Sequence, residues 1–214
     1  MRSVLKSLGH CVATIVVAPM LITFSIRSLL IGRDRALQGA TEALGLVPGL
    51  TGIMLRRAFL ARVLPYCSST ATIACGVILS SASARLADHC YVGPYCTLGH
   101  VEVGAHALIA AGVRIPSGRH AHPSGELDAV GPTRVSGRSR VCIGPRAWIG
   151  TGAIVMADVG ADTVVGAGAV VTTPLEGCVV AVGAPARVVR RRAPSLSPEA
   201  DLKVGSYTPL EDAR

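Results

Sequence analysis

The chain has 214 residues, enough for one domain with a small appendage, and its net charge is +8. Half of the residues are hydrophobic but only 3% are aromatic, which disfavours an ordinary globular core built on Phe, Tyr and Trp. The basic residues gather near the two ends, yet the aromatic platforms and recognition-helix patterns of nucleic-acid-binding proteins are missing, so we expect no nucleic-acid partner. Seven cysteines form no CxxC pair, which favours a reducing compartment.

Twenty residues without a formal charge run from Ser7 to Ile26, between Lys6 and Arg27. The segment is just long enough to span a bilayer core, but Pro19 interrupts it, and a kinked monotopic helix or a re-entrant hairpin fits as well. No small-residue cleavage site supports a signal peptide, and a buried helix packed on a trimer is the remaining alternative. We expect a peripheral or single-span protein at the cytoplasmic face of the inner membrane, because basic residues are denser after the segment.

Residues 36–66 are expected to form two short amphipathic helices, broken at Val47-Pro48-Gly49. Four apolar residues of the second helix share one face, with three arginines elsewhere: Leu55, Phe59, Leu60 and Val63, against Arg56, Arg57 and Arg62. We expect this connector to lie at the membrane surface or to cap the open end of the structure that follows.

A six-residue period dominates the middle of the chain. A helix would place apolar residues three and four apart, and a lone strand would alternate them, so the period predicts the stacked coils of a parallel β-helix. The aliphatic residue that opens each block points into the lumen, and the small residue after it lets the chain turn. Such coils are usually left-handed, so the expected fold is an all-β solenoid, a left-handed parallel β-helix with an N-terminal helical, apolar extension. The block starts are Ile73, Leu79, Leu86, Val92, Leu98, Val103, Ile109, Ile115, Ile143, Ile149, Val155, Val159, Val165 and Val171.

The repeat divides the chain into a helical, membrane-associated cap over 1–66, the β-helix over 67–190 and a disordered tail over 191–214. A polar loop at 116–140, rich in Gly, Pro and Ser, interrupts the β-helix, and long loops of this kind are more often functional than accidental. The loop contains His120 and His122, and a neutral imidazole near pH 7 is the usual general base for a hydroxyl. The four-residue step from Val155 to Val159 shortens one coil.

Together, the repeats, the SGRH of the loop, the WIGTG at 148–152 and the VGAPARVV at 182–189 resemble the hexapeptide-repeat acyltransferases. Within that family the chain looks most like the O-acetyltransferases of surface-polysaccharide synthesis and the galactoside and maltose acetyltransferases. The resemblance covers about 70–190.

The resemblance implies roles for individual residues. The catalytic base would be His120, with His122 as a close second, and the backbone N–H of Thr151 would meet the developing oxyanion. Arginines 190–192 could join in binding the phosphates of coenzyme A (CoA). The implied cofactor-binding residues, at a groove between subunits of a homotrimer, are Trp148, Gly150, Gly168, Ala169, Thr172, Gly183, Ala184, Pro185 and Arg187.

The implied function is acetyl-CoA-dependent O-acetylation of a sugar hydroxyl on a surface-polysaccharide or glycolipid precursor, with no metal. One alternative is a non-catalytic, membrane-tethered β-helix scaffold. Another is a γ-type carbonic anhydrase, in which His100 and His106 could stack with His89 near in sequence, but the accompanying motif is missing and three converging ligands are needed. Loss of turnover on changing the loop histidines would separate the enzyme from the scaffold.

Overall fold

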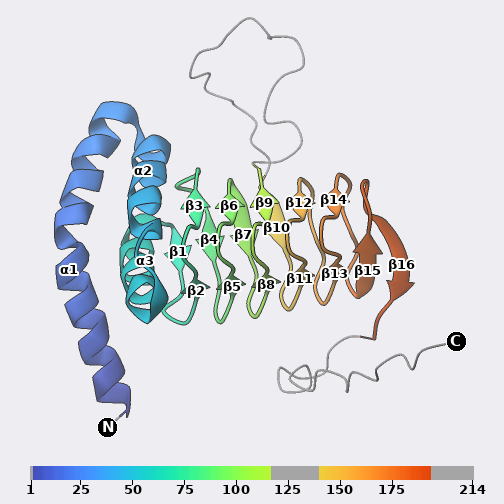
Figure 1. The fold of residues 1–214 in the computed structure, drawn as a ribbon, viewed down its shortest axis with the longest axis horizontal. Coiled ribbons are helices and arrows are strands. Elements are labelled where there is room, and N and C mark those ends of the chain that lie inside the picture. Colours follow the sequence, from blue (N-terminus) through green and yellow to red (C-terminus); the bar gives the residue numbers. More distant parts are fainter. Residues whose placement is uncertain (1, 117–139, 194–214) are drawn as a thin grey trace, which may run out of the picture.

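Three helices precede a solenoid of short strands in the computed structural model, which describes residues 2–116 and 140–193 (Figure 1). The helices are α1 (Arg2–Ile31), α2 (Arg33–Gly45) and α3 (Gly49–Val63). The two helices after α1 therefore occur where the sequence predicts them, separated at the predicted break. Side chains before residue 13 and the part of the predicted tail from residue 194 onward lie outside the described part. The first residues of that predicted tail belong to the solenoid instead, since Arg191 ends its last strand and Arg192 N donates to Cys178 O at 2.7 Å.

The strands form three parallel sheets, one on each face of a left-handed β-helix of about five turns, as predicted. Sheet A contains β1 (Tyr66–Cys67), β4 (Arg85–Leu86), β7 (Val101–Val103) and β10 (Val141–Ile143). Sheet B contains β2 (Thr72–Ile73), β5 (Tyr91–Val92), β8 (Leu108–Ile109), β11 (Trp148–Ile149), β13 (Val164–Val165), β15 (Val179–Val182) and β16 (Arg187–Arg191), of which only β16 is antiparallel to its neighbour. Sheet C contains β3 (Ile78–Leu79), β6 (Thr97–Leu98), β9 (Arg114–Ile115), β12 (Ile154–Val155) and β14 (Val170–Val171).

The lumen is filled by the residues that open the predicted blocks. Every one of them, from Ile73 to Val171, is no more than 2% exposed. The short step at Val155 ends at Val159, which makes single bridges to Ile143 and Leu175 instead of a strand. Leu175 opens one further block, four residues after Val171, that the sequence analysis did not include. The six-residue period is thus the period of one face of the prism.

Two of the three edges of the prism hold a column of residues with positive φ among the described residues. Between sheets B and C, the B–C edge, these are mostly glycines: Gly76, Tyr95, Gly112, Gly152, Gly168 and Gly183. Between sheets A and B, the A–B edge, they carry side chains: His89, His106, Arg146, Asp162 and Cys178. The conformation directs each backbone N–H to the preceding coil, as where Gly168 N donates to Thr151 O at 2.8 Å.

Helices α2 and α3 close the N-terminal end of the solenoid. Polar groups on the first coil, which has no coil before it, bond to these helices instead. Gly76 N donates to Gly45 O at 3.0 Å, Leu79 N to Thr41 Oγ1 at 3.2 Å, and Ala82 N to Asp34 Oδ1 at 2.9 Å. The predicted cap is therefore hydrogen-bonded to the solenoid, because a β-helix left open would expose unpaired strand edges.

The position of Arg56 differs from the expected one. This arginine was expected away from the packed face of α3, but its side chain is only 2% exposed. Its Nε donates to Ile73 O at 2.9 Å, and its Nη1 donates to Leu44 O at 2.9 Å and Val47 O at 2.7 Å. Leu44 lies in the last turn of α2 and Val47 just after it, at the end of a helix that carries partial negative charge. Burial lowers the pKa of Arg56.

Candidate functional site

The predicted loop starts and ends at one edge of the prism. The chain leaves sheet C after β9 and re-enters sheet A at β10, between the third and fourth coils (Figure 1). His120 and His122 belong to residues 117–139 and lie outside the described residues. The structure describes the two residues where this segment begins and ends, 116 and 140. These two residues, the loop base, lie at the edge between sheets C and A, which we call the C–A edge.

A polar cluster stands where the chain returns from the loop. Arg140 pairs with Glu102, with Nη1 and Oε2 2.9 Å apart, and its Nε donates to His100 Nε2 at 3.4 Å. The backbone continues this contact, since Val141 N donates to His100 O at 2.9 Å. Arg140 and Glu102 are both well exposed, so their ion pair adds at most about 1 kcal/mol. Sequence reasoning missed this cluster, although His100 and Glu102 lie in the five-residue step just before the loop's own coil.

Thr151 lies one face away, on the B–C edge. Its carbonyl accepts a hydrogen bond from Gly168 N, whereas its own N–H has no acceptor among the residues that the structure describes. Ala111 and Ala167 hold the equivalent place in neighbouring coils, and their N–H groups are likewise without a described acceptor. An N–H without a described acceptor is thus common to this position of the B–C turn in successive coils. Thr151 supplies this N–H in the coil that follows the loop.

The B–C edge around Thr151 has little side-chain cover. At Gly152 and Gly168 the φ values are +69° and +66°, and a Cβ added to either would meet no atom within 4 Å. Gly183 continues the column, since its carbonyl accepts from Val170 N at 2.9 Å. We call the column of Thr151, Gly152, Gly168 and Gly183 the bare edge. Its residues are exposed, and the N–H of Thr151 is a backbone donor available to a ligand laid along it.

Other predicted cofactor residues divide into two groups around this edge. Ala184, Pro185 and Arg187 follow Gly183 and are exposed beside it, and Trp148 stands exposed on the outer face of sheet B. The remaining three do not join it. Gly150 and Ala169 are buried between coils, where a Cβ on Gly150 would lie 2.5 Å from Ala167 N, and Thr172 follows β14 towards the C–A edge.

The arginines near the C-terminal end point to different places. Arg187 opens β16 opposite Val182, beside the bare edge. Arg191 instead pairs with Glu176 at 3.2 Å, and Arg192 donates to Asp162 O at 3.2 Å, over by the A–B edge. Of the arginines proposed to meet phosphates, Arg187 is the one beside the bare edge.

The A–B edge carries two of the three histidines of the carbonic anhydrase alternative, His89 and His106, whereas His100 lies at the C–A edge. His89 stacks on His106 with ring centroids 5.0 Å apart, so the stacked pair is not the predicted His100 and His106. Two coils further on, Arg146 holds Asp162 through two hydrogen bonds of 2.7 and 2.6 Å. In the described part of the chain, no group of three or more His, Cys, Asp or Glu residues could hold a metal ion.

Thiol chemistry is suppressed in the lumen. Burial raises the pKa of Cys67 and Cys90 to about 12 and that of Cys96 to about 11. A thiol with such a pKa stays protonated near pH 7 and is a poor nucleophile. These three cysteines therefore serve as small apolar residues.

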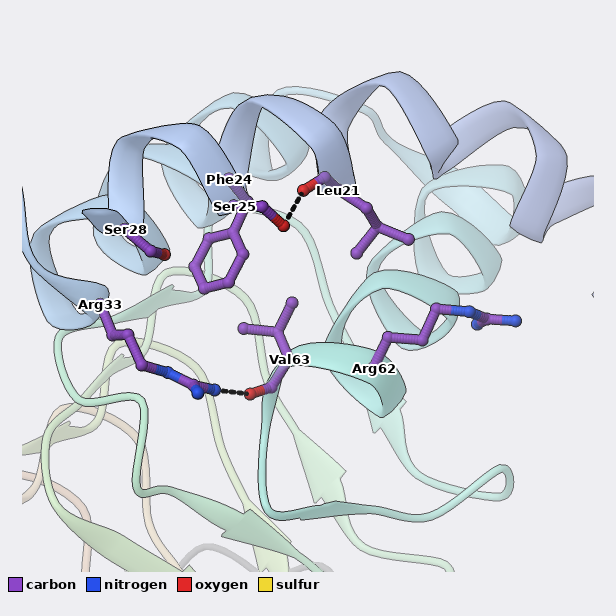
Figure 2. Close-up of a pocket in the computed structure, with 7 residues that line it drawn as sticks. All are labelled: Leu21, Phe24, Ser25, Ser28, Arg33, Arg62 and Val63. Carbon is purple, nitrogen blue, oxygen red and sulfur yellow. Dashed lines mark hydrogen bonds between the residues drawn. The ribbon is translucent and has the colours of Figure 1, made fainter. Parts of the chain in front are cut away.

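A cavity of about 280 Å³ lies among the helices, away from the bare edge (Figure 2). Leu21, Phe24, Ser25 and Ser28 of α1 line one side, and Arg33, Arg62 and Val63 line the other. Arg33 is tied down there, since its Nη2 donates to Val63 O at 2.9 Å. The cavity shares no residue with the loop base or the bare edge.

No protein-family model matches the chain. Among solved structures, a maltose O-acetyltransferase from Clostridium difficile 630 is 24% identical, with a TM-score of 0.56 over 77% of this chain and 89% of its own. A galactoside acetyltransferase solved with coenzyme A is 23% identical, with a TM-score of 0.53 over 78% and 82%. A hexapeptide-repeat acetyltransferase from Vibrio cholerae is 19% identical, with a TM-score of 0.53 over 74% and 92%. At such identities these likenesses establish the fold, which is that of hexapeptide-repeat acetyltransferases.

Proposed function

We propose that this protein is an acetyl-CoA-dependent O-acetyltransferase that acts on a sugar hydroxyl. The observation that carries the proposal is the bare edge, which lies in the coils that follow a histidine-bearing insertion. Neighbours of the same fold include a maltose O-acetyltransferase and a galactoside acetyltransferase bound to coenzyme A, which supports this choice of donor and acceptor. The acceptor we propose is a precursor of a surface polysaccharide or glycolipid at the cytoplasmic face of the inner membrane.

In the proposed reaction a loop histidine, His120 or His122, takes the proton of the acceptor hydroxyl as the oxygen attacks the thioester carbonyl. The carbonyl oxygen becomes an oxyanion, and the backbone N–H of Thr151 donates a hydrogen bond to it. Collapse of this intermediate breaks the carbon–sulfur bond and forms the acetyl ester. The thiolate of CoA then takes the proton from the imidazolium, which restores the neutral histidine.

We propose a homotrimer because one chain places the two halves of the site on different edges. The loop base is at the C–A edge and the bare edge lies a full face away, so a neighbouring subunit could bring its bare edge to the loop. An apolar column on the outer face of sheet B offers the contact surface. Tyr91, Leu108 and Trp148 pair in register there, and Trp148 is 52% exposed. Exposed apolar patches of this kind mark interfaces between subunits.

The decisive experiment measures acetyl-CoA binding by calorimetry and CoA release by chromatography, with maltose, galactosides and lipid-linked sugars as acceptors. We expect His120→Ala or His122→Ala to keep acetyl-CoA binding but to lose at least about 100-fold in turnover, because a general base contributes 10²–10⁴-fold. His89→Ala, on the A–B edge, is the matched histidine control and should keep full turnover. Wild-type protein that binds no acetyl-CoA would contradict the proposal and favour the scaffold.

A further inference from the structure

One face of α1 is apolar and uncovered. Exposed residues recur along it at every third or fourth position, and their exposed fractions run from 54% at Ile26 to 89% at Leu29. Thr23 also lies on this face, but its Oγ1 donates to Met20 O at 2.9 Å, so the hydroxyl is satisfied within the helix. The face, which we call the outer stripe, is about 24 Å long at 1.5 Å per residue. It consists of Ile15, Val16, Pro19, Ile22, Ile26, Leu29 and Leu30.

The opposite face of α1 is fixed to the rest of the protein. Ala13, Val17 and Phe24 are buried there, and the ring centroids of Phe24 and of Phe59 in α3 lie 5.7 Å apart in a T-shaped arrangement. Arg62 of α3 also donates to Thr14 Oγ1 at 2.8 Å. Figure 2 shows α1 lying along α3, with Phe24 directed towards Val63. Because α2 and α3 are hydrogen-bonded to the first coil, α1 is part of one packed unit with the solenoid.

This packing conflicts with a spanning helix. Ala13–Ile31 is long and apolar enough to cross a bilayer. However, α1 runs across the end of the solenoid as its outermost layer, in contact with α2 and α3 (Figure 1). A spanning α1 would carry α2 into the hydrocarbon with it, including the exposed groups of Arg35, Gln38 and Glu42. Charged and amide side chains that face lipid at that depth are costly.

We propose that α1 lies in the plane of the membrane, with the outer stripe inserted into one leaflet and the solenoid outside it. The occupant of this face is a bilayer surface that contains anionic lipid. Four exposed arginines lie on or beside α1: Arg27 near its C-terminal end, Arg33 and Arg35 at the start of α2, and Arg62 in the last turn of α3. They outnumber the partly buried Asp34 and the exposed Glu42. This excess of positive charge suits anionic headgroups, while the stripe enters the boundary between headgroups and acyl chains. The inference does not depend on the proposed enzymatic activity.

Depth measurements on the full-length protein test the proposal. Trp148 is the only tryptophan, so Trp148→Phe removes the intrinsic tryptophan fluorescence. Single tryptophans then replace Ile15, Ile22 or Leu29 as fluorescent probes. Vesicles of phosphatidylethanolamine and phosphatidylglycerol, with bromine at defined depths of the acyl chain, would quench each probe. An in-plane helix places all three probes at one shallow depth, about 5–10 Å below the headgroups. A deep probe at Ile22 between shallow probes at Ile15 and Leu29 would overturn the proposal in favour of spanning.

A flotation assay supplies the matched control. We expect Ile22→Asn with Ile26→Asn to reduce the fraction that floats with anionic vesicles at least about tenfold, while Val188→Asn with Val189→Asn, equally exposed on β16, floats as wild type does. Circular dichroism would establish that both variants remain folded. Wild-type protein that does not bind the vesicles, or tryptophans in the stripe that no bromine quenches, would show that something other than lipid covers this face.

Discussion

At the scale of single residues, Arg56 links the helical cap to the solenoid. Its guanidinium bonds to the carbonyls of Leu44 and Val47, at the junction between α2 and α3, and to that of Ile73 in β2. A buried carbonyl that loses its donor costs about 1–3 kcal/mol. The Arg56 side chain therefore contributes a large part of the free energy that holds the helices on the first coil.

We therefore predict that Arg56→Met lowers the free energy of unfolding by about 2 kcal/mol or more, since the carbonyls of Val47 and Ile73 lose the bond from Arg56, whereas Leu44 O still accepts from Val47 N at 3.3 Å. Thermal unfolding followed by circular dichroism measures the effect. Arg35→Met, at an exposed position of α2, is the matched control and should shift the midpoint little. Equal shifts for the two variants would contradict the role given to Arg56.

At the scale of elements, the turns of the β-helix are alike in backbone but not in use. Gly112 and Gly168 have φ values of +67° and +66°, and open space surrounds the Cβ position of both. Only Gly168 belongs to the bare edge and to the predicted cofactor residues. Comparing substitutions at Gly112 and Gly168 therefore distinguishes the cost of placing a Cβ in a left-handed turn from the loss of contact with a ligand.

We predict that Gly112→Ala and Gly168→Ala each lower the free energy of unfolding by about 1–2 kcal/mol, the cost of a left-handed conformation for a residue with a Cβ. Only Gly168→Ala should also raise the KM for acetyl-CoA severalfold, because its methyl group would stand where the proposed ligand lies. Steady-state kinetics beside thermal unfolding gives both numbers. A similar rise in KM for Gly112→Ala would move the cofactor away from the bare edge.

Sequence reasoning succeeded best at this scale. The block starts from Ile73 to Val171 form the lumen because a coil of three flat faces repeats in the chain itself, and burial follows that period. The six-residue rule did not distinguish Val159, which forms only single bridges, from strand-forming starts such as Val165. Strand pairing depends on the neighbouring coils, so the short step at the C–A edge decided this difference.

At the scale of the whole molecule, two exposed apolar surfaces support the proposals above. The outer stripe of α1 covers one end, and the column through Tyr91, Leu108 and Trp148 runs along sheet B. Sheet A differs, since Arg85, Glu102 and Arg140 form ion pairs on its outer face or at its edge. These two apolar surfaces lie where we propose the membrane and the partner subunits, whereas sheet A carries charged residues.

We predict that Tyr91→Glu with Leu108→Glu converts the proposed trimer into a monomer, because two carboxylates would be buried in the apolar column without partners. Light scattering coupled to size-exclusion chromatography measures the mass. Tyr66→Glu, at an exposed position on sheet A, is the control and should leave the mass unchanged. A double variant that keeps the mass of the wild-type assembly would place the interface elsewhere.

The sequence by itself determined the solenoid, the helical extension with its break before Gly49 and the site of the insertion, because local periodicity, glycine and proline encode each of these directly. Tertiary structure decided what depends on contacts between distant segments. It buried Arg56, stacked His89 on His106 in place of His100, and separated Thr172 from Gly168 across a face of the prism. It also turned one face of α1 inward, because α2 and α3 fold back from the first coil. The pattern of hydrophobic residues along the sequence does not predict which face of α1 another helix will cover.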